Sequence, residues 1–123
     1  MRIGELAASA GISRDTLRYY ERAGLLPAPL RDAAGHRIYQ RRDVEWLQFL
    51  MRLRATGMPI SAMRRYGALR AEGEATLATR RTLLAAHRDR VRARMADMAH
   101  SLAALDRKIA HYDRMKGQAD DSD

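Results

Sequence analysis

The stretch SRDTLRYYERAGLL, residues 13–26, places arginines at positions 14, 18 and 22. An α-helix advances by about 100° per residue, so a spacing of four turns each arginine only about 40° from the last. The three arginines would therefore form one ridge. Ser13 is a good N-cap, because its hydroxyl can accept a free backbone N–H, and Gly24 can end the helix. The stretch predicts a short helix that carries guanidinium groups along one side.

The opposite side of this helix has the residues of a packed face. Leu17 and Tyr20 lie there, three positions apart, while Asp15 and Tyr19 flank the arginines. Arginines on a recognition helix reach phosphates or guanine edges, and a phenol hydroxyl can bind a phosphate oxygen. The alternative is an exposed helix whose arginines pair only with Asp15 and Glu21. Both interpretations fit the spacing.

A second short helix is predicted before this one. Between residues 3 and 10, apolar side chains recur at i, i+3, i+4 and i+7 and so form one face. Gly11 then interrupts the pattern, and Pro27 and Pro29 prevent the following helix from continuing. Helix, tight glycine turn and helix make up the helix-turn-helix layout.

Residues 29–39, PLRDAAGHRIY, are predicted to form a short hairpin. Asp32 and Gly35 supply the turn, and Leu30 and Ile38 on the two arms can face the core. A basic hairpin that follows a helix-turn-helix is a wing, which can lie along the DNA backbone beside the groove.

Three residues at or after the tip of this hairpin are candidates for contacts with DNA: His36, Arg37 and Tyr39. For His36 taken alone, a solvated loop histidine is the favoured interpretation. The order of helix, turn, helix and basic wing, rather than any one of these residues, points to nucleic acid.

Two further helices complete the predicted first domain, residues 1–72. The helix over 41–56 has a wide apolar stripe and is expected to form the core. Gly57 ends it, and Pro59 suits the first turn of the next helix. The polar segment 71–75 is the clearest boundary.

From residue 76 onward, apolar residues repeat every seven positions, in two series offset by four, as the a and d positions of a coiled coil do. Arg81 and Arg88 fill the second series early on and do not suit a dry seam. The tight seam is therefore expected over about 91–112, while the first turns, with Leu83, pack on the N-terminal domain. The residues expected at a dimer interface are Leu84, Val91, Met95, Met98, Leu102, Leu105, Ile109 and Tyr112.

A lone helix would leave this apolar seam in water, so a partner is required. A symmetric homodimer is the simplest partner. We therefore expect a dimerisation helix over 76–114, followed by a polar tail over 115–123 that is disordered.

The positive charge is concentrated in the first part of the chain. The net charge is +8, and residues 1–72 hold 13 arginines against 7 acidic residues, which leaves only +2 for residues 73–123. A basic domain favours a polyanionic partner, either nucleic acid or an anionic membrane surface, although a solvated basic surface is the simpler alternative. Only Lys108 and Lys116 are lysines. Codon bias and a preference for bidentate phosphate contacts both explain this excess of arginine.

Several function classes are not expected. The chain has no cysteine, which excludes disulfides, thiolate metal sites and thiol sensing within it. No run approaches the ~18 apolar residues of a membrane span, and no signal peptide opens the chain, so a cytoplasmic, nucleoid-associated protein is expected. No cofactor motif, metal-ligand spacing or nucleophile–base pairing predicts an enzyme. His100 and His111 lie about 16 Å apart on the long helix, so only a pair across a dimer could share an ion.

The chain resembles the MerR family of bacterial transcription regulators along nearly its whole length. The matching stretches are IGELAASAGISRDTLRYYERAGLL, GHRIYQRRDVEWLQFL, RATGMPISAMRRY and the long helix. The resemblance implies a mainly α fold, with a winged helix-turn-helix on each subunit and an antiparallel coiled coil between subunits. It also implies that the dimer binds a pseudo-palindrome in a promoter with an overlong spacer. Bending and untwisting would then align the elements for RNA polymerase when a small effector is present.

The resemblance also assigns DNA contacts residue by residue. Arg18 and Tyr19 match contact positions of the recognition helix, Arg37 and Tyr39 match wing positions on the phosphate backbone, and Tyr20 resembles a packed tyrosine. The full set of expected DNA-binding residues is Arg14, Asp15, Thr16, Arg18, Tyr19, Arg22, His36, Arg37 and Tyr39.

The chemistry of effector sensing does not carry over from the family. The C-terminal part is similar to a subgroup that responds to aldehydes or other electrophiles, but members of that subgroup commonly carry a cysteine and this chain has none. Any effector site is expected between the fourth helix and the long helix, around Met58, Met63, Tyr66 and Leu83.

The leading functional hypothesis is a sequence-specific DNA-binding regulator of transcription. An effector-independent repressor is an alternative within that class. The rival from another class is a membrane-surface or scaffolding protein with a basic domain and a coiled coil. An ordered arginine ridge beside a wing argues against that rival, because membrane adhesion needs no such order.

Overall fold

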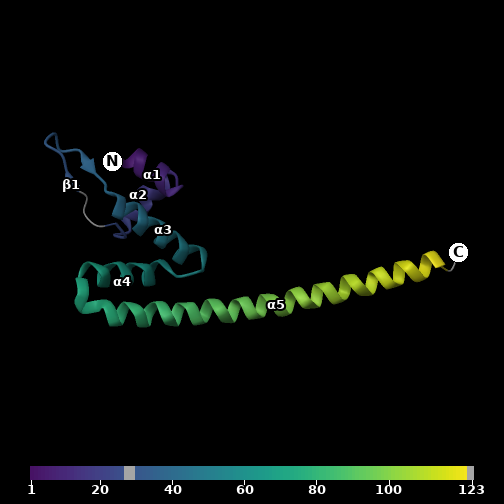
Figure 1. Ribbon diagram of the computed structural model, residues 1–123. Coiled ribbons are helices and arrows are strands. Elements are labelled where there is room, and N and C mark those ends of the chain that lie inside the picture. The colour runs from purple at the N-terminus through teal and green to yellow at the C-terminus, as the bar shows by residue number, and fades with distance from the viewer. Residues whose placement is uncertain (27–29, 122–123) are drawn as a thin grey trace. The chain divides into compact units, whose positions relative to one another are not determined.

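A computed structural model of the chain describes residues 1–26 and 30–121. The described part is mainly helical, with one two-stranded antiparallel sheet and one long C-terminal helix (Figure 1). The expected mainly α class with a small hairpin wing is therefore confirmed. The chain forms two compact units, Met1–Ala85 and Ala86–Asp123. Pro27 and Pro29, which were expected to stop the second helix, lie outside the described residues.

The first two helices form the predicted helix-turn-helix. Helix α1 spans Ile3–Ala10 and helix α2 spans Arg14–Arg22. Gly11 ends α1 in the left-handed region at φ 73°, which glycine adopts without steric penalty. Ser13 begins α2 as predicted, since its Oγ accepts a hydrogen bond from the Thr16 backbone N–H at 3.1 Å.

The predicted hairpin is present as strands β1 (Leu30–Arg31) and β2 (Arg37–Ile38), in which Leu30 pairs with Ile38. The expectation that both of these residues face the core is wrong for Leu30, which is 55% exposed. Strands of two residues bury little by themselves, and the chain enters the core only after β2, through Tyr39.

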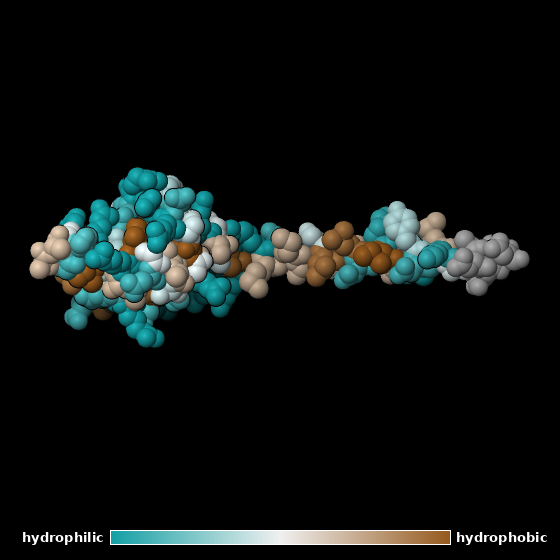
Figure 2. Space-filling model, turned by 90° about the horizontal axis from the view of Figure 1, so that it is seen from above, coloured by the Kyte–Doolittle hydropathy of each residue, from teal (hydrophilic) through white to brown (hydrophobic). Residues whose placement is uncertain are grey.

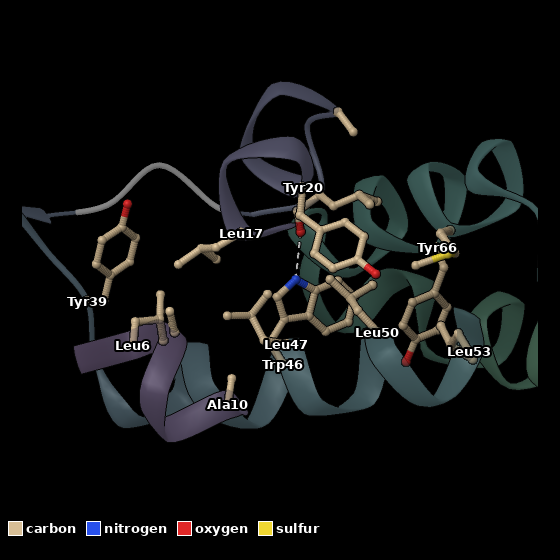
Figure 3. Packing of buried hydrophobic residues seen from close by; sticks show 14 of the residues in the cluster. Leu6, Ala10, Leu17, Tyr20, Tyr39, Trp46, Leu47, Leu50, Leu53 and Tyr66 are labelled. Carbon is tan, nitrogen blue, oxygen red and sulfur yellow. Dashed lines mark hydrogen bonds between the residues drawn. The ribbon is translucent and has the colours of Figure 1, made fainter. Parts of the chain in front are cut away.

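Helices α3 (Arg41–Ala55) and α4 (Ile60–Ala71) supply much of the core. Trp46 joins three elements: its Nε1–H donates to the Leu25 carbonyl at 2.7 Å, and its ring stacks on Tyr66 with centroids 5.6 Å apart (Figure 3). The core therefore locks the segment that follows α2 onto α3 and α4. The buried apolar residues are Leu6, Ala7, Ala10, Leu17, Tyr20, Ala23, Leu25, Tyr39, Trp46, Leu47, Leu50, Leu53, Met58, Met63 and Tyr66.

A hydrogen-bonded 3-10 turn, η1 (Gly73–Thr76), stands where the sequence predicted a boundary, and helix α5 (Leu77–Asp121) follows it. The Thr76 hydroxyl contacts the Leu69 carbonyl at 2.5 Å, and Arg80 Nε donates to the Thr76 Oγ1 at 3.0 Å. The start of α5 is thus fixed to the end of α4.

The first turns of α5 belong to the first unit. Leu83 and Leu84 pack against its hydrophobic core, as expected for the early half of this helix. Because of this packing, the first unit extends to Ala85, beyond the limit of 72 that the sequence suggested. Leu84 is therefore a core contact as well as a member of the heptad series.

The second unit is the remainder of α5, and it exposes the predicted seam. The heptad residues from position 95 on are each between 58% and 71% exposed. Figure 2 shows hydrophobic side chains, brown and tan, at the surface along α5. A single helix cannot bury them against itself. The exposed seam residues are Met95, Met98, Leu102, Leu105, Ile109 and Tyr112.

The end of α5 corrects one expectation. Residues 115–123 were expected to be disordered, but the helix continues through Asp121, and only 122–123 lie outside the described residues. Methionine, lysine, glutamine and alanine in this segment are good helix formers, and extending an existing helix needs no new nucleus. Polarity alone was therefore a poor indicator of disorder. None of the helices in the described part of the chain is long and apolar enough to cross a bilayer.

The substitution Trp46→Phe tests the link between α2 and the core. It keeps an aromatic ring but leaves the Leu25 carbonyl without its buried donor, so we expect a loss of about 2–3 kcal/mol in the free energy of unfolding. Urea unfolding followed by far-UV circular dichroism measures this loss. Leu30→Ala, at an exposed position, should change stability by less than about 0.5 kcal/mol. Equal stability of Trp46→Phe and the wild type would show that the hydrogen bond to Leu25 is not important.

Candidate nucleic-acid interface

Helix α2 separates a packed face from an exposed ridge. Leu17 is fully buried and Tyr20 is 5% exposed, so both hold the helix against the core. The three arginines that follow at intervals of four are all exposed. We call Arg14, Arg18 and Arg22 the arginine ridge.

The ridge is not neutralised by the neighbouring acids. Across residues 1–26 and 30–121, neither Asp15 nor any ridge arginine takes part in an ion pair. Glu21 has its charge partner on the wing instead. The interpretation in which the arginines merely pair with Asp15 and Glu21 is therefore wrong, and the guanidinium groups remain available for an external anion.

The residues beside the ridge differ in their exposure. Tyr19 is 46% exposed, and its ring lies tilted against that of Tyr20, with centroids 5.8 Å apart. Asp15 is exposed, whereas Thr16 is half-buried and its hydroxyl accepts from Ser13 Oγ at 2.9 Å. The Tyr19 hydroxyl and the Asp15 carboxylate can thus reach a ligand, and Thr16 mainly completes the N-terminal cap.

Arg14 does not extend freely from α2. Its guanidinium lies over Gly4 of α1, where a Cβ atom added to Gly4 would come within 2.5 Å of Arg14 Nη2. Because Gly4 has no side chain, there is room beside it for the Arg14 guanidinium.

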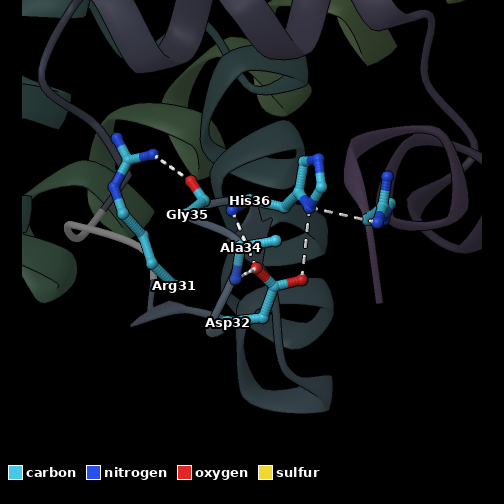
Figure 4. Close-up of polar contacts among 6 residues, drawn as sticks. Arg31, Asp32, Ala34, Gly35 and His36 are labelled. Carbon is cyan, nitrogen blue, oxygen red and sulfur yellow. Dashed lines mark hydrogen bonds and ion pairs between the residues drawn. The ribbon is translucent and has the colours of Figure 1, made fainter.

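The tip of the wing is a turn organised by one carboxylate (Figure 4). Asp32 Oδ1 accepts from the backbone N–H groups of Ala34 and His36, both at 2.9 Å, and the Gly35 N–H donates to the Asp32 carbonyl at 3.0 Å. The hydrogen bond from the His36 N–H, aided by that from Ala34, holds the pKa of the Asp32 carboxyl below its ordinary value. The predicted turn residues are confirmed.

His36 itself is exposed and has local partners. Its Nδ1 lies 3.4 Å from Asp32 Oδ2 and 3.3 Å from Arg2 Nη2 (Figure 4). These contacts agree with the interpretation of His36 as a loop histidine. They leave it at the surface of the wing, where a contact with DNA stays a prediction.

The other two wing residues, Arg37 and Tyr39, both bind Glu21. Arg37 Nη1 lies 2.6 Å from Glu21 Oε2, and the Tyr39 hydroxyl donates to the other oxygen, Oε1. Burial, and then the nearby carboxylate, raise the pKa of the Tyr39 phenol, while contacts with Tyr39 and Glu21 raise the pKa of the Arg37 guanidinium. We call these three residues the Glu21 bracket.

The bracket corrects the role expected for Tyr39. This residue is only 2% exposed and belongs to the core, so its hydroxyl does not reach the surface to contact a phosphate. The Arg37 side chain, in contrast, remains 49% exposed. Of the two wing residues that the resemblance assigned to the backbone, only Arg37 can present its donors to DNA.

Two residues of this surface were missed by the sequence reasoning. Glu21 lies four positions after Leu17, on the same side of α2, and a carboxylate so close to a buried face needs a partner. That signal was present in the sequence. Arg64 of α4, whose Nε donates to the Ala23 carbonyl at the end of α2 at 2.9 Å, had no comparable signal, because α4 and α2 are far apart in the chain.

The tentative effector residues are part of the packed core. Met58 and Met63 are fully buried, Tyr66 is 8% exposed, and Leu83 packs against the same cluster. A ligand could reach these side chains only by displacing core contacts. The structure therefore gives no support to an open site around them.

Two family models match the chain. The model of the MerR helix-turn-helix family regulatory protein matches residues 1–68, and a model described as MerR, DNA binding matches residues 44–108. The transcriptional regulator AdhR of Bacillus subtilis is 38% identical over 91 residues, which cover 74% of this chain. The chain spans only 65% of the length of AdhR.

Solved structures agree with this match. A MerR family regulator from Listeria monocytogenes is 40% identical, with a TM-score of 0.85 and coverage of 92% of this chain and 86% of that chain. HiNmlR, described as a MerR family regulator lacking the sensor domain and bound to promoter DNA, is 32% identical, with a TM-score of 0.81 and coverage of 94% and 92%.

These similarities decide between the functional classes. The relatives are transcriptional regulators, so they support neither an enzyme nor a membrane-surface scaffold. A regulatory family model covers the helix-turn-helix, the wing and the core helices together. The chain belongs to the MerR family of helix-turn-helix, DNA-binding transcription regulators.

Proposed function

We propose that this protein binds a pseudo-palindromic promoter site as a homodimer and controls transcription by distorting the DNA between the half-sites. The observation that carries the proposal is the arginine ridge. It is exposed and forms no ion pair among the described residues, and it lies on a helix whose other face is packed. A protein with this role acts on the nucleoid, in the cytoplasm. It affects RNA polymerase through the geometry of the promoter.

In this proposal α2 enters the major groove. Guanidinium groups bind guanine edges in bidentate fashion or pair with phosphates, and the Tyr19 hydroxyl reaches a phosphate oxygen. Asp15 is positioned to accept from a base amino group, since it is exposed near the start of α2. Arg37 and His36 of the wing follow the sugar–phosphate backbone beside the groove.

The proposed dimer forms through the exposed seam of α5. Six large apolar side chains at heptad spacing, all more than half exposed, make a stripe that a second copy of the same helix would cover. Family resemblance favours an antiparallel pair. Two such helices hold two recognition helices at a fixed separation, which a pseudo-palindrome can match.

Regulation in this proposal does not need an open effector pocket around Met58, Met63, Tyr66 and Leu83. The residues considered for an effector site are packed in the core, and HiNmlR, a similar protein, is described as lacking the sensor domain while bound to promoter DNA. An effector that acts on this chain would need differential affinity for two arrangements of the dimer on DNA. An effector-independent repressor needs only the groove contacts.

The first prediction of this proposal concerns Arg18. Replacing it with alanine removes a charge-assisted contact, so binding to the promoter site should weaken by about 1–3 kcal/mol. Because each subunit of the homodimer carries one Arg18, the slope of log affinity against log salt should also fall in magnitude by about 1.8, which is about 0.9 for each phosphate contact that is lost. Fluorescence anisotropy titrations at several salt concentrations measure both. Arg107→Ala, at an outward heptad position of α5, is the matched control. If the two variants bind alike, α2 is not the recognition helix.

A second prediction concerns the seam. Replacing Leu102 and Leu105 together with aspartate places two charges per chain in an apolar interface, so the dimer should dissociate. Sedimentation velocity measures its mass. The control is Ala103→Asp, which adds one negative charge per chain at a position beside the seam and should stay dimeric. An intact dimer in the double variant would place the interface elsewhere. Promoter binding should be lost with the dimer, because one half-site offers too few contacts.

A third prediction concerns DNA distortion. If the dimer holds its recognition helices closer than the natural spacing of the half-sites, the DNA between them must bend or untwist, at a cost of about 1–6 kcal/mol. Operators with flexible pyrimidine–purine steps at the centre should therefore bind more tightly than operators with identical half-sites and a stiff central tract. Affinity measurements and chemical probing of the central bases test this. If affinity does not depend on the central sequence of the operator and the central bases stay unreactive, the protein is a repressor that only occupies the groove.

A further inference from the structure

Glu21 is an unusual residue for a surface that binds DNA. It lies on α2 directly before Arg22, yet its side chain is only 17% exposed. Its two oxygens accept from different partners, Arg37 at 2.6 Å and the hydroxyl of Tyr39. A carboxylate that is largely removed from water is stable only when its oxygens are satisfied in this way.

The bracket joins the recognition helix to the wing. Arg37 lies in β2 and Tyr39 follows that strand, while Glu21 belongs to α2. The backbone of Tyr39 is fixed as well, because its N–H donates to the Met1 carbonyl at 2.7 Å, and its ring is buried in the core. Tyr39 thus holds one carboxylate oxygen from a rigid position, and the other oxygen is directed at Arg37.

This arrangement holds the Arg37 guanidinium in one orientation and leaves some of its N–H donors available. A guanidinium has five N–H donors in a planar fork, and the contact with Glu21 Oε2 is made through Nη1. About half of the Arg37 side chain remains exposed. An arginine held in one orientation loses less conformational entropy when it binds a phosphate than a freely rotating one does.

We propose that Glu21 is a positioning residue for DNA binding: without touching DNA, it fixes the wing against the recognition helix and directs Arg37 at the phosphate backbone. The inference rests on the proposed function, because it needs Arg37 to contact DNA. The inference adds that an acidic residue of α2 sets the position of the wing.

The direction in which DNA affinity changes when Glu21 is removed distinguishes a positioning role from a purely electrostatic one. Removing Glu21 makes the protein one unit more positive, and a more positive surface attracts DNA more strongly. Electrostatics alone therefore predicts tighter binding for Glu21→Ala. Positioning predicts weaker binding, because Arg37 loses its orientation and the wing loses its link to α2.

The experiment is a double-mutant cycle on binding to one promoter fragment. We expect Glu21→Ala and Arg37→Ala each to weaken binding by roughly tenfold, as for the loss of one charge-assisted contact. The double variant should bind about as weakly as Arg37→Ala alone, because Glu21 acts through Arg37. If the two losses multiply, Glu21 acts elsewhere and the inference is wrong. Equal or tighter binding by Glu21→Ala would overturn it too.

Two further variants isolate the charge and the hydroxyl. Glu45→Ala removes an acidic residue at an exposed position of α3 and serves as the matched charge control, so its binding should be unchanged or slightly tighter. Tyr39→Phe keeps the buried ring but removes the hydroxyl that holds Oε1, so it should weaken binding severalfold in the wild type and have no effect in the Arg37→Ala background. An effect of the same size in both backgrounds would mean that Tyr39 only stabilises the fold.

Folding and the proposed function are checked separately. Urea unfolding and circular dichroism establish that each variant is folded, and if Glu21→Ala is not, the same cycle is run with Glu21→Leu, which keeps a larger side chain without an acceptor oxygen and is judged by the same criterion. Wild-type protein that fails to prefer the promoter fragment over scrambled DNA would contradict the proposed function itself. Preference by the wild type together with an additive cycle would contradict only the role of Glu21.

Discussion

The burial of Leu17 and Tyr20 is the contact on which the recognition surface depends. A helix of nine residues such as α2 is not stable alone in water, so it exists because these side chains fill the core. Once they are buried, helical geometry decides where the arginine ridge must point. The Trp46 hydrogen bond to Leu25 and the Arg64 hydrogen bond to Ala23 then secure the end of the same helix. The positions of the exposed guanidinium groups are therefore set by groups that lie in the interior of the protein.

Several acidic residues of the first unit bind groups within the protein, whereas the arginines of the arginine ridge remain exposed. Asp32 organises the tip of the wing, Asp43 accepts from the Gln40 N–H at 2.7 Å at the start of α3, and Glu21 joins the wing to α2. These carboxylates are engaged with groups inside the protein. The surface that faces solvent along α2 is thus more positive than the net charge of the first unit suggests, because part of the negative charge is used within the fold.

Much of this structure could be predicted from local pattern, and most of the errors come from contacts between distant parts of the chain. The Ser13 cap, the apolar faces of α1 and α2, the turn at Asp32 and the packing of Leu83 follow from spacing or from side-chain chemistry along a single segment. Tyr39 and Leu30 were misplaced because their exposure depends on what packs over them from distant parts of the chain. Pairing of Glu21 with the arginines of α2 was left open as an alternative, while its actual partners lie 16 and 18 residues away. The continuation of α5 past residue 115 was missed because polarity was weighed above helix propensity.

The contact between Arg14 and Gly4 has a consequence for how such regulators diverge. Position 4 lies in α1, away from the recognition helix in sequence, yet a single added methyl group there would meet the guanidinium of Arg14. A substitution in α1 can therefore redirect a side chain of the arginine ridge without altering any residue of that ridge. Descendants of one ancestral chain could therefore differ in how α2 presents its arginines while the sequence of α2 stays the same.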